Sequence, residues 1–145
     1  MKKWMISVLV LAASAFAVGS VDAKQSSIAG AWTFTVEHLG LKLVLDQQKS
    51  TVSGTLDWPH GDPVKLTGVF VDDTLIVSGT SIGEGGNFSV HIDARGVRKP
   101  DGTLSGTLKA HFDEFNDAHQ IVRTRNQDIA WTAVRGLHNL SHFQR

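Results

Sequence analysis

The chain has 145 residues, 41% of them hydrophobic and 19% charged, and its formal net charge at pH 7 is +0. A protein this close to neutrality has no field that would steer it to DNA or to an anionic membrane surface, so no nucleic acid is expected as a partner. Cysteine is absent. This excludes disulfides and an acylated lipoprotein anchor, and leaves stability to core packing and hydrogen bonds.

The first 23 residues have the pattern of a signal peptide. Lys2 and Lys3 form a short basic region, the stretch 6–18 is almost continuously apolar, and the segment 21–23 carries small residues where a signal peptidase cleaves. We expect cleavage after Ala23 and release of the mature chain into the periplasm or the medium. The apolar stretch is shorter than the ~20 residues that a spanning helix needs, so no membrane span is expected in the mature form.

From residue 24 to residue 136, apolar and polar residues alternate with a period of two, which indicates strands with one buried face. The pattern predicts eight strands, at about 31–38, 41–47, 51–58, 64–71, 74–80, 87–94, 103–112 and 127–135. Short turns between successive strands indicate an antiparallel meander. Eight such strands close most economically into an up-and-down barrel, which removes exposed edges. The predicted fold is therefore all-β, with a single barrel domain over 24–136 and a tail over 137–145, either frayed or forming one short helical turn.

Glycine recurs on the apolar side of four predicted strands, at Gly54, Gly68, Gly79 and Gly106. Glycine weakens a strand, so its presence there needs a reason. One explanation is geometric, because small barrels bend tightly at glycines. The other is functional, because missing side chains leave room for an internal ligand. The geometric explanation is favoured, since a barrel needs curvature with or without a ligand.

The first predicted strand opens with Gly30-Ala31-Trp32 and the last closes with Trp131-Thr132-Ala133-Val134-Arg135. Between them, segments of the type Ser-Gly-Thr-Leu recur. In these features the sequence resembles the lipocalin-like (calycin-type) domains of bacterial secreted proteins, over roughly 28–136. The resemblance implies that Trp32 packs across the closed end of the barrel against Arg135, a cation–π contact of about 0.5–2 kcal/mol. The segment 113–127 departs from the family pattern. It is longer and more polar than the usual last hairpin, and could form a lid at one barrel mouth.

The apolar face thinned by glycines favours a non-enzymatic protein that binds a small apolar or amphipathic ligand inside the barrel. The expected ligand-binding residues are aromatic side chains on the inward phase or beside a mouth loop: Trp32, Phe34, Trp58, Phe88 and Trp131. Trp58 could equally plug the barrel end. No cofactor is expected.

Two other classes of function stay open. A barrel enzyme of the isomerase, cyclase or lyase type would need ionisable side chains in the cavity. The predicted inward phase has almost none, so we lean against catalysis, although a bulge could turn His38, His91 or Asp93 inward. An interaction or inhibitor module would bind a protein partner through hairpin loops, with 83–86 or 113–126 as candidates.

A metal site is a weaker hypothesis. His91 and Asp93 share one face of a predicted strand, and His111 lies on the matching face of the next, so the two imidazoles could be neighbours across a hairpin. Zinc or copper accepts such ligands but needs a third or fourth. All three residues alternate out of phase with the apolar positions, so a solvated face is the favoured explanation.

The acidic segment 113–119 carries oxygen ligands of the type that calcium binds. It lacks the spacing of an EF-hand loop, so it is expected to be a solvated loop.

Overall fold

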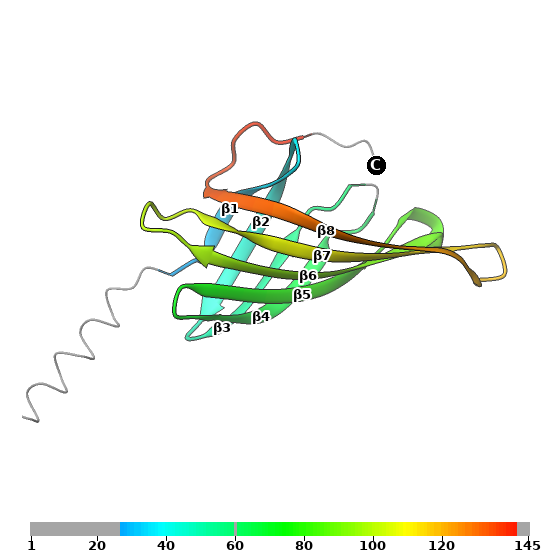
Figure 1. The fold of residues 1–145 in the computed structure, drawn as a ribbon, viewed down its shortest axis with the longest axis horizontal. Coiled ribbons are helices and arrows are strands. Elements are labelled where there is room, and N and C mark those ends of the chain that lie inside the picture. Colours follow the sequence, from blue (N-terminus) through cyan, green and yellow to red (C-terminus); the bar gives the residue numbers. More distant parts are fainter. Residues whose placement is uncertain (1–26, 60, 142–145) are drawn as a thin grey trace, which may run out of the picture.

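The structure is a computed structural model that describes residues 27–59 and 61–141. Eight antiparallel strands form a closed barrel in which each strand pairs with its neighbours in the chain and β1 pairs with β8 (Figure 1). The elements are β1 (Gly30–Val36), β2 (Leu39–Gln48), β3 (Thr51–Leu56), β4 (Val64–Val71), β5 (Thr74–Ile82), the 3-10 helix η1 (Glu84–Gly86), β6 (Phe88–Arg98), β7 (Leu104–Phe115) and β8 (Ile121–Arg135). The predicted all-β, up-and-down barrel is confirmed.

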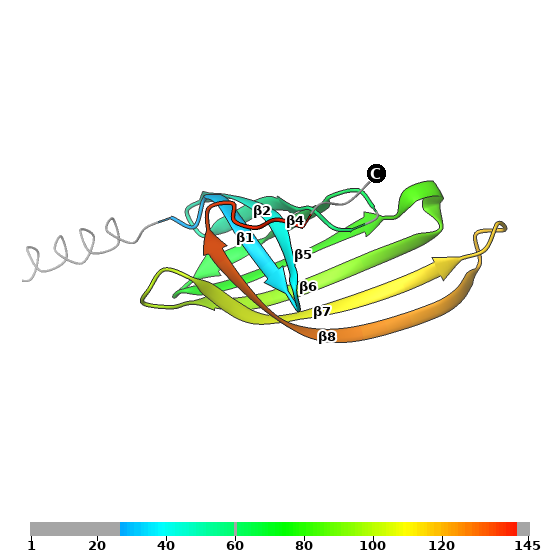
Figure 2. The ribbon, with the colours of Figure 1, turned by 90° about the horizontal axis from the view of Figure 1, so that it is seen from above.

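The last three strands are longer than predicted. β6 continues to Arg98, β7 continues to Phe115, and β8 begins at Ile121. The predicted loop over 113–127 is therefore wrong, because most of these residues form a long β7–β8 hairpin that projects beyond the rest of the barrel (Figures 1 and 2). Residues 121–128 are all exposed. Because neither face of this part of β8 is buried, its sequence shows no alternation of apolar and polar residues, and the strand was not predicted before residue 127.

The core consists of inward-facing apolar side chains from every strand. Phe34 and Trp131 stack within it, with ring centroids 4.8 Å apart. Among the described residues, the only buried polar side chains are those of Thr33 and Ser81.

The prediction that the inward phase contains almost no ionisable residue holds for the described core, where no ionisable side chain is buried. It does not hold beyond the core, because Glu114, Arg123 and Arg125 continue the same phase along the projecting ends of β7 and β8.

The four glycines of the apolar phase lie where neighbouring strands come very close. A Cβ atom on Gly54, Gly68, Gly79 or Gly106 would lie 2.2, 1.8, 2.1 or 1.8 Å, respectively, from a carbonyl oxygen of the adjoining strand. Such distances cannot be relieved without moving the backbone. The geometric explanation is therefore confirmed at these positions: the glycines let the barrel wall curve, and a side chain there would meet backbone rather than empty space.

The segment after β8 neither frays nor forms a helix over its described part, 136–141. It folds back over the outer face of β1, where Thr33 Oγ1 donates a hydrogen bond to the Gly136 carbonyl at 2.7 Å and accepts one from the His138 N–H at 2.8 Å. The N–H of Ser141 donates to the Gly40 carbonyl at 2.8 Å. These contacts bury Thr33, an outward-facing residue, and cover one side of the barrel.

No helix in the described part of the chain is long and apolar enough to cross a membrane. The predicted signal peptide over 1–23 lies outside the described residues.

Candidate binding site at the open end of the barrel

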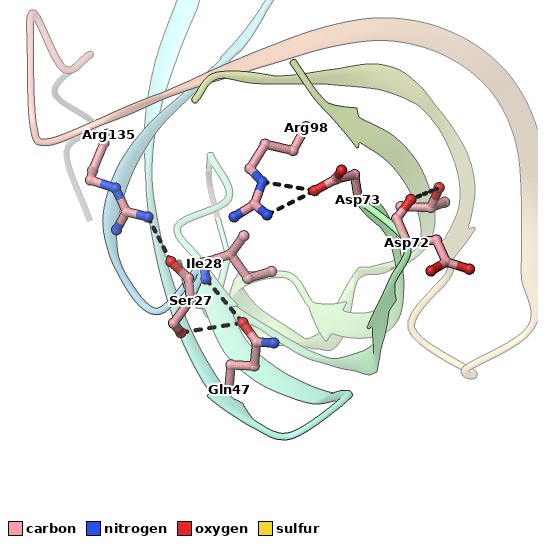
Figure 3. Close-up of polar contacts among 8 residues, drawn as sticks. Ser27, Ile28, Gln47, Asp72, Asp73, Arg98 and Arg135 are labelled. Atoms are coloured by element: carbon pink, nitrogen blue, oxygen red, sulfur yellow. Dashed lines mark hydrogen bonds and ion pairs between the residues drawn. The ribbon is translucent and has the colours of Figure 1, made fainter. Parts of the chain in front are cut away.

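One end of the barrel is sealed by the segment that precedes β1 (Figure 3). Ile28 is fully buried there, and its N–H donates a hydrogen bond to Gln47 Oε1 at 2.9 Å. Trp32 Nε1 donates to the Ile28 carbonyl at 2.9 Å. The Arg135 guanidinium lies 4.4 Å from the centroid of the Trp32 ring and donates to the Ser27 carbonyl at 2.8 Å. The contact between Trp32 and Arg135 that the family resemblance implies is confirmed.

A second arginine lies at this sealed end. Arg98 Nη2 lies 2.7 Å from Asp73 Oδ1 (Figure 3). The Arg98 guanidinium also lies 5.1 Å from the centroid of the Phe70 ring. Trp32, one of the predicted ligand-binding residues, is therefore part of a plug held by two cation–π contacts. Trp32 lies near the N-terminal end of β1, whereas Trp58 follows the C-terminal end of β3, at the other end of the barrel.

The opposite end is open and contains a pocket of about 310 Å³. We call this pocket the aromatic pocket; it is lined by Trp58, Pro59, Phe88, Phe112, Glu114 and Arg125. The rings of Trp58 and Phe112 lie 6.3 Å apart, and the Arg125 guanidinium lies 5.2 Å from the centroid of Phe112. The structure thus brings together two of the five predicted ligand-binding residues, Trp58 and Phe88.

Three charged side chains, those of Glu114, Arg123 and Arg125, lie at the aromatic pocket or beside it. Arg123 donates to Glu114 through Nε at 2.9 Å and through Nη2 at 2.6 Å. These hydrogen bonds lower the pKa of Glu114 and raise that of Arg123. Arg125 forms no ion pair with any described residue and rests on Phe112 instead. The aromatic pocket therefore combines aromatic surface with one guanidinium, that of Arg125, which has no carboxylate partner among the described residues.

Sequence reasoning missed Phe112, Glu114 and Arg125 as members of this site. Phe112 stands opposite Arg125 in the β7–β8 register, a pairing that exists only because β8 begins well before residue 127. One signal was available: Phe112 and Glu114 continue the phase of Leu108 and Ala110. Extending that phase past residue 112 would have placed both residues on the inner face.

Phe34 and Trp131, the two other predicted ligand-binding residues, lie in the core and stack on each other. Trp131 is 2% exposed, and its Nε1 has no hydrogen-bond partner among the described residues. An unpaired buried donor costs about 1–3 kcal/mol. Trp131 is therefore the place in the described core where a polar atom of a bound molecule would be favourable.

The histidine candidates lie on the outer face of the wall. His91 and His111 are directly opposite in the β6–β7 register, as predicted. Each ring has its own partners: His91 Nε2 lies 3.4 Å from Asp93, and His111 Nε2 lies 3.1 Å from Asp113. No group of three or more histidine, cysteine, aspartate or glutamate side chains that could hold a metal ion occurs among the described residues.

The titration of His111 gives a test of this outer network. A hydrogen bond to Asn126 raises the pKa of His111, and the charge of Asp113 adds to the effect. A histidine whose pKa is raised on folding stabilises the folded protein when the pH is below the ordinary histidine pKa. This stabilisation is lost as the pH rises through the folded-state pKa. In NMR titrations we expect a higher pKa for His111 in the wild-type protein than in Asn126→Ala. Identical titration curves would contradict the hydrogen bond as the main cause.

Two hollows lie outside the barrel wall. One, of about 410 Å³, crosses β4 to β7 and has Ile76, Asp93 and Lys109 in its lining. The other, of about 390 Å³, lies between β1 and the C-terminal segment and has His38 and His138 in its lining. Asp93 and Lys109 alternate with the core residues of their strands, and all four named ionisable side chains are exposed, so neither hollow brings them into the barrel interior.

A scan against protein-family models finds no family that matches this chain, and a search of curated proteins finds no similar protein. The class of protein is therefore defined by its architecture. It is an eight-stranded antiparallel β-barrel, consistent with a calycin-like fold, with one end sealed around Trp32 and the other end open at the aromatic pocket.

Proposed function

We propose that this protein binds a small amphipathic ligand at the open end of its barrel. The supporting observation is the aromatic pocket, whose volume of about 310 Å³ is within the range of small-molecule sites, roughly 300–1,000 Å³. Trp58, Phe88 and Phe112 offer apolar surface to the body of the ligand. Arg125, stacked on Phe112, offers a guanidinium to a polar or anionic head group. A ligand long enough to reach the core would also find the free N–H of Trp131.

The same proposal places the chain among lipocalin-like proteins that act outside the cytoplasm. The barrel topology and the contact between Trp32 and Arg135 support the family assignment. The basic and apolar pattern of residues 1–23 supports export, with the mature chain released into the periplasm or the medium after cleavage at Ala23.

Two fluorescent probes test the binding site: anilinonaphthalene sulfonate, which is anionic, and phenylnaphthylamine, its neutral analogue. We expect both to bind the mature protein with increased fluorescence. Trp58→Ala should weaken both at least about tenfold, which corresponds to about 1.4 kcal/mol of lost aromatic contact. Arg125→Gln should weaken the sulfonate and leave the neutral probe unchanged, because only the sulfonate needs the cation.

Ile76→Ala is the matched control, because Ile76 lines the outer groove and is 45% exposed. This variant should bind both probes like the wild-type protein. If Ile76→Ala abolished binding while Trp58→Ala did not, the ligand site would be the outer groove and the proposal would be wrong. It would also be wrong if neither probe bound the wild-type protein.

The enzyme alternative has weaker support. The ionisable side chains that line the aromatic pocket are Glu114 and Arg125. A general base works best with a pKa near the operating pH. The hydrogen bonds from Arg123 instead lower the pKa of Glu114, so this carboxylate stays ionised and paired.

The second alternative is a module that binds a partner protein through a hairpin. The projecting β7–β8 hairpin is the observation that favours it (Figure 2).

A further inference from the structure

β8 is paired on both sides only near the sealed end of the barrel. Its register with β1 covers Trp131 to Arg135, whereas its register with β7 extends from Ala133 back to Ile121. Along 121–130, β8 has β7 on one side and no described strand on the other. We call this stretch the free edge; it follows the open half of the barrel and the projecting hairpin (Figure 2).

The direction of the hydrogen bonds identifies which backbone groups the free edge offers. The N–H of Gly136 donates to the Ala31 carbonyl beside β1. Residues of a regular strand direct their backbone groups alternately to the two sides, and the β7–β8 register is regular from Arg123 onward. The even-numbered residues therefore direct their N–H and C=O groups to the open side: Thr124, Asn126, Asp128 and Ala130. No described residue hydrogen bonds to these groups on that side.

On the inner face, the charged side chains leave the free edge uncovered. Natural proteins protect an exposed edge with charges, proline or bulges. Residues 121–130 contain no proline, glycine or lysine. Arg123 forms an ion pair with Glu114, and the Arg125 guanidinium stacks on the ring of Phe112. Glu114 and Phe112 both belong to β7, on the side away from the free edge. Neither guanidinium therefore shields the backbone of β8.

On the outer face, two polar side chains, those of Thr124 and Asn126, are also directed to β7. Thr124 Oγ1 donates to Asp113 at 2.7 Å, and Asn126 Oδ1 lies 2.7 Å from His111 Nδ1. These contacts hold the projecting part of β8 in a regular, extended conformation. The edge is thus ordered in advance, which reduces the entropy cost of adding another strand.

We propose that the free edge binds an extended, acidic segment of a partner protein as an added β-strand. The backbone groups of residues 124–130 supply hydrogen bonds, and the inner face supplies selectivity. Arg123 and Arg125 are two residues apart on that face; Glu114 pairs with Arg123, and Arg125 has no carboxylate partner among the described residues. Residues directly opposite in an antiparallel pair have Cβ atoms about 5 Å apart, so acidic side chains at alternate positions of the added strand face the two arginines.

A second copy of this chain fits the edge less well. Two β8 edges related by a two-fold axis place residues of the same face opposite one another. The inner-face residues of the free edge are Ile121, Arg123, Arg125, Gln127 and Ile129. None of them is acidic, and Asp128 lies on the other face. Self-pairing therefore offers no carboxylate to the arginines, whereas an acidic segment does.

The test uses a labelled peptide, Val-Thr-Glu-Thr-Glu-Thr-Val, and fluorescence anisotropy with the mature protein. We expect this peptide to bind, and the same peptide with lysine in place of both glutamates to bind at least tenfold more weakly. Asp128→Pro should weaken the glutamate peptide at least tenfold, because it removes an N–H from the free edge and leaves the bonds to β7 in place. Asp128→Ala, which keeps that N–H, should bind like the wild-type protein.

A second pair of variants, Thr124→Pro and Thr124→Ala, repeats the comparison farther from the barrel, where loss of folding is not at issue. Circular dichroism checks that each variant is folded. The proposal is overturned if the glutamate peptide does not bind the wild-type protein, or if both proline variants bind it with unchanged affinity. It is also overturned if sedimentation shows a dimer that the proline variants dissociate, because the edge would then pair with its own copy.

Discussion

Gly106→Ala and Gly68→Ala are each expected to lower the free energy of unfolding by more than about 3 kcal/mol, or to prevent folding. The added Cβ would lie 1.8 Å from the Arg95 carbonyl oxygen in the first variant and 1.8 Å from that of Ile76 in the second. Both oxygens belong to the backbone of the adjoining strand, which cannot move without breaking the barrel ladder. Urea denaturation of the wild-type protein and of each variant measures the effect.

Gly61→Ala is the control for these two variants. A Cβ at Gly61 would meet its nearest atoms at 3.4 Å, an ordinary van der Waals distance. We expect this change to alter the free energy of unfolding by less than about 1 kcal/mol. If Gly68→Ala and Gly106→Ala were tolerated as well as Gly61→Ala, these glycines would not be needed for curvature.

Trp32→Ala is expected to cost about 3–5 kcal/mol of the free energy of unfolding, the range for removing a large buried aromatic side chain. Trp32 is 0% exposed, donates a hydrogen bond to the Ile28 carbonyl and supports the Arg135 guanidinium. Its removal would leave Ile28 and Arg135 without their packing surface. The loss should appear as a lower urea midpoint and a lower melting temperature.

Trp58→Ala provides a comparison with the same residue type at the open end. Trp58 is only partly buried, so we expect a smaller loss of about 1–2 kcal/mol. Equal losses at the two tryptophans would contradict the distinction between a structural plug and an open pocket. A much larger effect of Trp58→Ala on probe binding than on stability would support that distinction.

The two ends of the barrel are expected to have different roles, one structural and the other in ligand binding. The sealed end is held by Ile28, Trp32 and Arg135, all tied to backbone groups or to each other. The open end exposes Trp58 and Arg125 beside a pocket. A ligand is therefore expected to enter and leave at the open end, where side chains move without disturbing the core.

The barrel class and the Trp32–Arg135 contact could be predicted from the sequence. One buried face imposes a period of two on every strand, and this local pattern is visible without a structure. It placed Phe34 and Trp131 in the core and grouped the four curvature glycines on one phase. The proximity of Trp32 and Arg135 was implied by a resemblance rather than by spacing, and the structure bears it out.

The start of β8, the side chains that meet at the open end and the edge that lacks a partner could not be predicted from the sequence. The β8 arm of the projecting hairpin is exposed on both faces, so burial imposes no apolar–polar alternation on residues 121–128. The aromatic pocket joins Trp58 to Phe88, Phe112 and Arg125 through the register of strands far apart in the chain. Such a register follows from closing the whole barrel, and no local pattern in the sequence encodes it.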